Sequence, residues 1–139
     1  MPLPIHHMIA AGPQPVAPFS HAVETDGWVF ITGQMPTDPK APEAPLPEGI
    51  EAQTRRVVAN LEIVLEGLGL GLEHATMARI YLTRFERGLR RAQRAVAELF
   101  RAGKAAGADH RGRHRAGGRR AGRDRSRRPA AVSALLSRR

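Results

Sequence analysis

Residues 50–68 read IEAQTRRVVANLEIVLEGL, and they form the clearest element of secondary structure in the chain. Their apolar side chains recur at helical spacing in one broad stripe: Val57, Val58, Leu61, Ile63, Val64, Leu65 and Leu68. A stripe of this width is typical of an amphipathic helix that packs on a core. Glycines at 67, 69 and 71 end the pattern, because glycine favours the C-terminal end of a helix.

Short strands are predicted on both sides of this helix. Residues 19–23 and 28–32 read as two strands joined around Thr25-Asp26-Gly27, and an Asp-Gly pair is a strong hairpin signal. Residues 76–83 predict a third strand, whose expected buried positions are Met77, Ile80 and Leu82. A weaker helical pattern covers residues 92–100.

The remaining segments divide the chain into an arm, one domain and a tail. Residues 1–15 are proline-rich and predict an extended arm that pairs at a sheet edge. Five prolines between 36 and 47 predict a surface loop. Residues 16–104 form the predicted domain, since 139 residues suffice for a single core. Residues 105–128 are nearly all Ala, Gly, Arg, His and Asp, so the 105–139 tail is expected to be disordered over most of its length.

The net charge of +9 is unevenly distributed. Residues 1–87 hold 6 Lys/Arg and 10 Asp/Glu, a net charge of −4, whereas residues 88–139 hold 16 Lys/Arg and 3 Asp/Glu, a net charge of +13. The chain has no cysteine, which fits a reducing compartment, and it shows neither a signal-peptide pattern nor a run of eighteen apolar residues. We therefore expect a cytoplasmic protein without a membrane partner.

Four sequence blocks together resemble the RidA (YjgF) family. They are APFSHAV at 17–23, WVFITGQMP at 28–36, IEAQTRRVVANLEIVL at 50–65 and ARIYLTRFER at 78–87. Each block alone is weak, but four in the right order and spacing are specific. The resemblance covers residues 16–87.

This resemblance implies an α+β, chorismate-mutase-like fold, with a mixed, mainly antiparallel sheet and two helices on one face. It also implies a homotrimer with ligand clefts between subunits, and hydrolysis of reactive enamines and imines such as 2-aminoacrylate to a 2-keto acid and ammonia. No cofactor and no metal are required. The family is also described as endoribonuclease L-PSP.

The substrate-binding residues implied by the resemblance are Phe19, Thr32, Gly33 and Gln34. Phe19 stands where many family members have a cleft-lining Tyr, and a buried strand position is the equally weighted alternative. Residues 32–34 resemble the family's cleft floor, although Gly33 has the alternative role of satisfying backbone geometry alone. His21 and His74 lack metal-ligand spacing and are expected to be structural or exposed.

The family's catalytic residues are absent from the written sequence. A 2-imino acid needs a guanidinium for its carboxylate and an acid/base group that steers water, and the family supplies these from P-A-R-x-x-V and V-E-I motifs. Residues 105–126, back-translated with GC-rich codons and read one base later, give LPARTTVGVTGLA and then LVEIDL. The same shift over residues 88–96 can give DYAALNALY, which restores the family's second helix and its Asn. We therefore hypothesise frameshifts near Gly88, Val96 and Ala105, and expect no catalytic residue in the written frame.

Two other functions fit the sequence. A non-catalytic RidA-like trimer would bind small carboxylated metabolites or a protein partner. A weaker alternative is RNA binding by the Arg-rich tail, in line with the endoribonuclease description, but the tail offers only His as a stacking ring. We expect nucleic acid not to be a specific partner.

Overall fold

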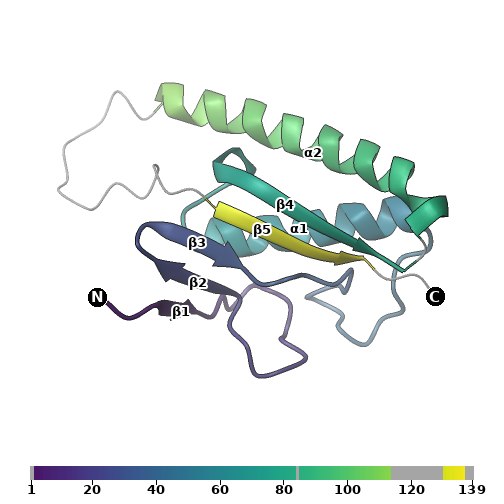
Figure 1. Ribbon diagram of the computed structural model, residues 1–139, viewed down its shortest axis with the longest axis horizontal. Coiled ribbons are helices and arrows are strands. Elements are labelled where there is room, and N and C mark those ends of the chain that lie inside the picture. Colours follow the sequence, from purple (N-terminus) through teal and green to yellow (C-terminus); the bar gives the residue numbers. More distant parts are fainter. Residues whose placement is uncertain (1, 84, 114–129, 137–139) are drawn as a thin grey trace.

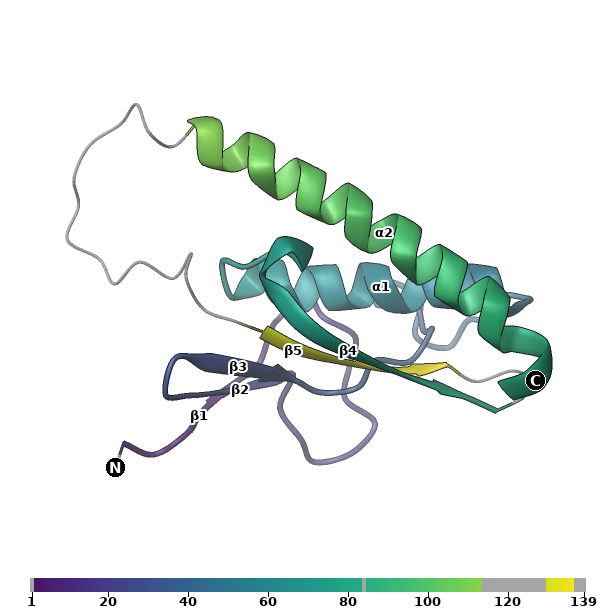
Figure 2. The ribbon, with the colours of Figure 1, turned by 45° about the horizontal axis from the view of Figure 1, so that its top comes forward.

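The chain forms an α+β fold in which two helices cover one face of a five-stranded sheet (Figures 1 and 2). The computed structural model describes residues 2–83, 85–113 and 130–136, with side chains described for residues 2–83 and 88–103. The elements are β1 (Ile5–His7), β2 (Ala22–Thr25), β3 (Trp28–Ile31), α1 (Ile50–Gly67), the 3-10 turn η1 (Leu72–His74), β4 (Ala75–Leu82), α2 (Phe85–Arg113) and β5 (Ala130–Leu136). The predicted fold class is confirmed.

The sheet has the order β1-β2-β3-β5-β4 and is mixed. The β1–β2 and β2–β3 pairs are antiparallel, whereas β5 runs parallel to both β3 and β4. The antiparallel half is therefore built from the N-terminal arm and hairpin, and the parallel half depends on a strand from the far end of the chain.

The hairpin forms as its turn residues predict. Asp26 and Gly27 connect β2 to β3 with φ values of 47° and 80°, so both residues occupy the left-handed region that a tight two-residue hairpin requires. The arm pairs with β2 through β1, where Ile5 lies opposite Glu24 and His7 opposite Ala22. The predicted edge pairing of the arm is confirmed, although β2 begins at Ala22 rather than at residue 19.

Helix α1 provides the largest share of the buried apolar core among the described elements. Its buried apolar residues are Val57, Val58, Leu61, Val64 and Leu65. The helix ends in two backbone hydrogen bonds, from Leu70 N–H to the Leu65 carbonyl and from Gly69 N–H to the Glu66 carbonyl. This pattern, with Gly69 at φ 70°, is a Schellman motif, and it explains why the glycine-rich stretch stops the helix.

In strand β4, the prediction that Met77 is buried is wrong. Ile80 and Leu82 pack against the core, but Met77 is 49% exposed on the opposite face. Successive strand residues alternate between faces, so Met77 cannot share a face with Ile80, three residues away. Met77 and Tyr81 instead lie on the face that the helices leave open, as do Trp28 and Phe30 of β3.

The C-terminal third contains more regular structure than its composition predicts. Helix α2 covers the predicted 92–100 segment but continues to Arg113, so the expectation of disorder is wrong for residues 105–113. Ala and Arg are strong helix formers, which offsets the lack of large apolar residues there. Residues 114–129 lie outside the described part of the chain.

Strand β5 gives β4 a sheet partner from the C-terminal third of the chain. Seven residue pairs, from Ala75–Ala130 to Leu82–Leu136, connect the two strands. The AAVSALL segment follows the Arg-rich stretch and has the small and apolar residues that a strand between two others requires. It contains neither of the family's catalytic motifs.

Candidate functional site

The four residues that the sequence assigns to substrate binding line one cavity. This cavity, called the Phe19 pocket below, has a volume of about 290 Å³. Its walls are Pro13, Gln14, Pro15, Val16, Phe19, His21, Thr32, Gly33, Gln34, Met35 and Thr37. The arm forms one side of the pocket and the chain that leaves β3 forms the other, so segments distant in sequence meet there.

Thr32 and Gln34 fix the floor of the Phe19 pocket. The Thr32 hydroxyl donates to the Ser20 carbonyl at 2.7 Å, and the Thr32 N–H donates to the His21 carbonyl at 3.0 Å. The Gln34 side-chain amide donates to the Thr32 carbonyl at 3.0 Å. The two bonds that Thr32 donates hold the segment after β3 against the segment before β2, and the Gln34 bond lies within the segment after β3.

The structure distinguishes between the alternatives for Phe19 and Gly33. Phe19 precedes β2 and is 41% exposed on the pocket wall, so it is not a buried strand residue. Gly33 does not have a positive φ, so its backbone conformation does not require glycine. Contact of either residue with a ligand stays a prediction.

Asn60 of α1 positions the loop after the pocket floor, and the sequence analysis did not identify it. Its side-chain amide donates to the Met35 carbonyl at 2.9 Å and to the Thr37 carbonyl at 2.8 Å, and the residue is fully buried. A polar residue in the middle of an apolar helical stripe was the available signal, because a buried amide needs partners.

His21 is buried beside the pocket, which agrees with the structural role expected of it. Its Nδ1 accepts the Ile9 N–H at 2.9 Å, and its Nε2 lies 2.7 Å from the Pro13 carbonyl oxygen. His74 is also structural, since its Nδ1 accepts the Gly71 N–H at 3.0 Å. Among the described residues, no three His, Asp or Glu side chains converge as metal binding would require.

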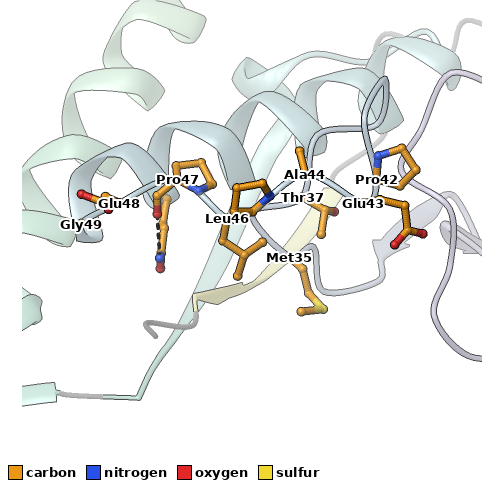
Figure 3. Close-up of a pocket in the computed structure, with 11 residues that line it drawn as sticks. Met35, Thr37, Pro42, Glu43, Ala44, Leu46, Pro47, Glu48 and Gly49 are labelled. Atoms are coloured by element: carbon orange, nitrogen blue, oxygen red, sulfur yellow. Dashed lines mark hydrogen bonds between the residues drawn. The ribbon is translucent and has the colours of Figure 1, made fainter.

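A second, wider hollow lies between the proline-rich loop and the start of α1 (Figure 3). Its volume is about 990 Å³, and its charged lining residues are Glu43 and Glu48. The Gln53 side chain donates to the Pro47 carbonyl at 2.9 Å across this hollow. Met35 and Thr37 line both cavities, so the loop that Asn60 holds separates them.

The described lining of the Phe19 pocket offers shape and hydrogen-bonding groups but no formal charge. None of the described residues that line the pocket is Asp, Glu, Lys or Arg. Arg55 of α1 lies on the helical side of the fold, where it contacts Glu51 at 3.1 Å and Glu98 at 3.3 Å. The pocket residues described here can therefore bind a small molecule, but they do not include an anchor for a carboxylate or a free general acid/base group.

No helix within the described residues combines the length and apolar character needed to cross a bilayer.

Comparison with known proteins identifies the family to which this chain belongs. The family described as endoribonuclease L-PSP matches residues 9–111. A RutC family protein of Saccharolobus solfataricus is 39% identical over 70 residues, which are 50% of this chain and 55% of that protein. A RutC family protein of Pyrococcus horikoshii is 37% identical over 70 residues, with the same coverage of 50% and 55%. The chain thus spans about half the length of the curated relatives it matches.

Solved structures show the same fold at low sequence identity. A Rid family protein of Yersinia pestis, YyfA, superposes with a TM-score of 0.62 at 18% identity, covering 96% of this chain and 86% of its own. TdcF of E. coli superposes with a TM-score of 0.61 at 14% identity, covering 94% and 84%. Because the family match takes in well over half of the chain, this protein belongs to the endoribonuclease L-PSP family, the RidA-type family that its four sequence blocks resemble.

Proposed function

We propose that this protein is a cytoplasmic RidA-type protein that binds small 2-imino and 2-oxo acids in the Phe19 pocket. The observation that carries the proposal is that Phe19, Thr32, Gly33 and Gln34, assigned from sequence alone, surround a single cavity. In support, the fold neighbour TdcF was solved with bound serine, a small amino acid with a carboxylate.

The proposed reaction is the hydrolysis of an imine and needs no cofactor. An enamine such as 2-aminoacrylate first moves a proton from nitrogen to its terminal carbon and becomes 2-iminopropanoate. Water then adds to the imine carbon, and the resulting carbinolamine loses ammonia and leaves pyruvate. An acid/base group must steer the water, and a guanidinium is the best anchor for the carboxylate.

The written chain accounts for binding but not for this catalysis. The Phe19 pocket has no Asp, Glu, Lys or Arg among its described lining residues, and the motifs that hold the family's Arg and Glu appear only when residues 105–126 are read in another frame. We therefore propose that the functional protein carries the frame-corrected C-terminal third. The written polypeptide would then bind a 2-oxo acid without hydrolysing an imine.

The open face of the sheet supports trimer formation. Trp28, Phe30, Met77 and Tyr81 are each 44–50% exposed on the face opposite the helices. An apolar sheet face of this kind marks a protein–protein contact. In a trimer, a neighbouring subunit would complete the cleft that begins at the Phe19 pocket.

The experiment compares two proteins: the written chain and the chain with residues 88–96 and 105–126 in the corrected frame. Intact mass and peptide mapping of the native protein first establish which one exists. Pyruvate and ammonia release is then followed with 2-aminoacrylate generated by a serine dehydratase, and 2-oxobutanoate binding is measured by calorimetry.

We expect saturable 2-oxobutanoate binding by both proteins, but faster imine hydrolysis only with the corrected one. Hydrolysis by the written chain would contradict the assignment of catalysis to the missing motifs. Binding without hydrolysis by both proteins would favour a non-catalytic metabolite-binding trimer. If neither protein binds 2-oxobutanoate, the proposed role of the Phe19 pocket is wrong.

A further inference from the structure

His21 is the one ionisable residue among those that line the Phe19 pocket, and both of its ring nitrogens bind the backbone of the arm. The Ile9 N–H donates to Nδ1 at 2.9 Å, and Nε2 lies 2.7 Å from the Pro13 carbonyl oxygen. The ring is 4% exposed, so water does not compete freely for either bond.

The two partners determine the protonation state of the ring. A backbone N–H can only donate, so Nδ1 must carry a lone pair. A backbone carbonyl can only accept, so Nε2 must carry the hydrogen. The contacts thus require a neutral imidazole with its hydrogen on Nε2, since an imidazolium would lose the bond from Ile9.

The two bonds hold the arm at Ile9 and at Pro13, and Pro13 is the first residue of the stretch that forms the pocket wall. Residues 13–16 line the pocket, and within the described structure the bond between Pro13 and His21 is the one hydrogen bond that ties these four residues to the sheet. Prolines at 13 and 15 lack an N–H, which removes half of the backbone donors of this stretch.

The packing around the ring indicates a close fit. A Cβ added to Gly12 would come within 3.0 Å of the His21 Nε2. A Cβ added to Gly67 of α1 would come within 2.6 Å of the Ile9 side chain, so Ile9 sits directly against the backbone of that helix. The arm is therefore fixed at Ile9 and at Pro13, with His21 as the common partner.

We infer that His21 is a positioning residue for the Phe19 pocket, in which a neutral imidazole holds the arm at Ile9 and Pro13, places residues 13–16 as one wall and thereby sets the affinity of the cavity for its ligand. The effect on affinity rests on the proposed function. The two hydrogen bonds between His21 and the arm, called the tether below, do not depend on it. The ligand of the pocket would be a small 2-oxo or 2-imino acid, which would contact the wall that His21 holds.

Two conservative substitutions at His21 each remove one of the two bonds and keep the other. His21→Asn keeps an oxygen acceptor near the position of Nδ1 but cannot reach Pro13. His21→Gln keeps an N–H donor near the position of Nε2 but loses the acceptor for Ile9. His21→Leu removes both. His6→Gln on the exposed edge strand is the control, since among the described residues the one hydrogen bond of the His6 side chain is to the Ser20 hydroxyl at 3.3 Å.

Three measurements follow the tether and the pocket. Amide hydrogen exchange of Ile9 reports the first bond, nitrogen-15 chemical shifts of the His21 ring report its tautomer, and calorimetry with 2-oxobutanoate reports the pocket. Exchange at α1 amides is recorded alongside, because a loss of global stability would accelerate exchange there as well.

We expect Ile9 exchange to rise about fivefold in His21→Gln, as the loss of one hydrogen bond predicts, and to stay unchanged in His21→Asn and His6→Gln. The 2-oxobutanoate affinity should fall about fivefold in His21→Asn and His21→Leu but be largely retained in His21→Gln, which keeps the wall bonded at Pro13. If His21 merely filled space, the exchange rates and affinities of His21→Asn and His21→Gln would not differ in this way.

Two results would overturn the inference: a ring hydrogen on Nδ1, or Ile9 exchange in His21→Gln equal to that of the unmodified protein. If the unmodified protein does not bind 2-oxobutanoate, the proposed function fails, and the exchange and tautomer measurements still decide whether the tether exists.

Discussion

At the scale of single residues, the polar side chains buried beside the pocket serve to hold backbone. Asn60 donates both amide hydrogens to the loop between the two cavities, and its own oxygen has no hydrogen-bond partner within the described part of the chain. Such a group is costly to alter, because the two carbonyls it satisfies would be left without a donor.

Asn60→Asp tests this arrangement, because it changes the hydrogen-bonding groups at nearly constant volume. A carboxylate oxygen would face the Met35 and Thr37 carbonyls, so we expect a loss of about 2 kcal/mol or more in the free energy of unfolding at pH 7. The loss should shrink at low pH, where the protonated acid can donate again. Urea unfolding at both pH values measures it, and Ala52→Asp, on the exposed first turn of α1, is the control and should change stability by less than about 0.5 kcal/mol. An equal effect at the two positions would show that the added charge alone, and not the loss of the two Asn60 hydrogen bonds, is responsible.

Glu62 gives a pH dependence of stability that can be assigned to one residue. Partial burial raises the pKa of its carboxyl above the usual 4.5, and the nearby Glu66 raises it further. The folded protein therefore holds this proton more tightly than the unfolded chain, and stability falls as the pH rises from the usual value through the raised one.

Glu62→Gln should accordingly stabilise the protein at pH 7, by about 0.5 kcal/mol as is usual for partly exposed positions, and should have no effect below pH 4. Thermal unfolding between pH 3.5 and 7.5 measures the difference. Glu51→Gln is the matched control, because Glu51 forms an ion pair with Arg55 and its loss should not stabilise. A gain that did not depend on pH would point to helix propensity instead of charge.

At the scale of elements, the contacts of α2 explain which of its glycines matter. A Cβ at Gly103 would lie 2.7 Å from the Cβ of Leu72 in η1, whereas a Cβ at Gly88 would meet Ile50 at an ordinary 3.4 Å. Close packing at Gly103 thus brings α2 onto η1, and Leu72 is almost fully buried there.

Gly103→Ala and Gly88→Ala therefore form a matched pair on the same helix. The first should destabilise the fold by about 1–3 kcal/mol, because the Leu72 Cβ belongs to a packed core and cannot move aside freely. The second should be neutral or stabilise by up to about 1 kcal/mol, since Ala is the better helix former. Chemical denaturation of both variants measures the contrast, and a stabilising Gly103→Ala would show that α2 does not rest on η1.

At the scale of the whole molecule, the sheet has one covered and one open face. The helices cover Val29 and Ile31, and the alternate residues of the same strand, Trp28 and Phe30, face away from them. The exposed apolar side chains on this open face are the basis for expecting a trimer.

Phe30→Glu should prevent that assembly, because burying a carboxylate against another subunit without a partner costs several kcal/mol. We expect light scattering to report a monomer for this variant, with unchanged helical circular dichroism. Gln93→Glu, on the exposed side of α2, should retain the assembly of the unmodified protein. A Phe30→Glu protein that still forms trimers would assign the interface to another surface.

The local patterns of the sequence determined the hairpin, α1 and β4, because turn residues and apolar periodicity act over a few neighbours. The substrate-binding role of Phe19 and residues 32–34 was assigned only through the family resemblance and stays a prediction. The tertiary structure decided what depends on distant contacts. Met77 faces away from the core because strand register, and not hydrophobicity, sets the face. Asn60 and His21 are positioning groups only because the fold brings the Met35–Thr37 loop and the arm within hydrogen-bonding distance. Strand β5 is stable between β3 and β4 because two neighbours satisfy its backbone, an effect that no window of composition around residues 130–136 can show.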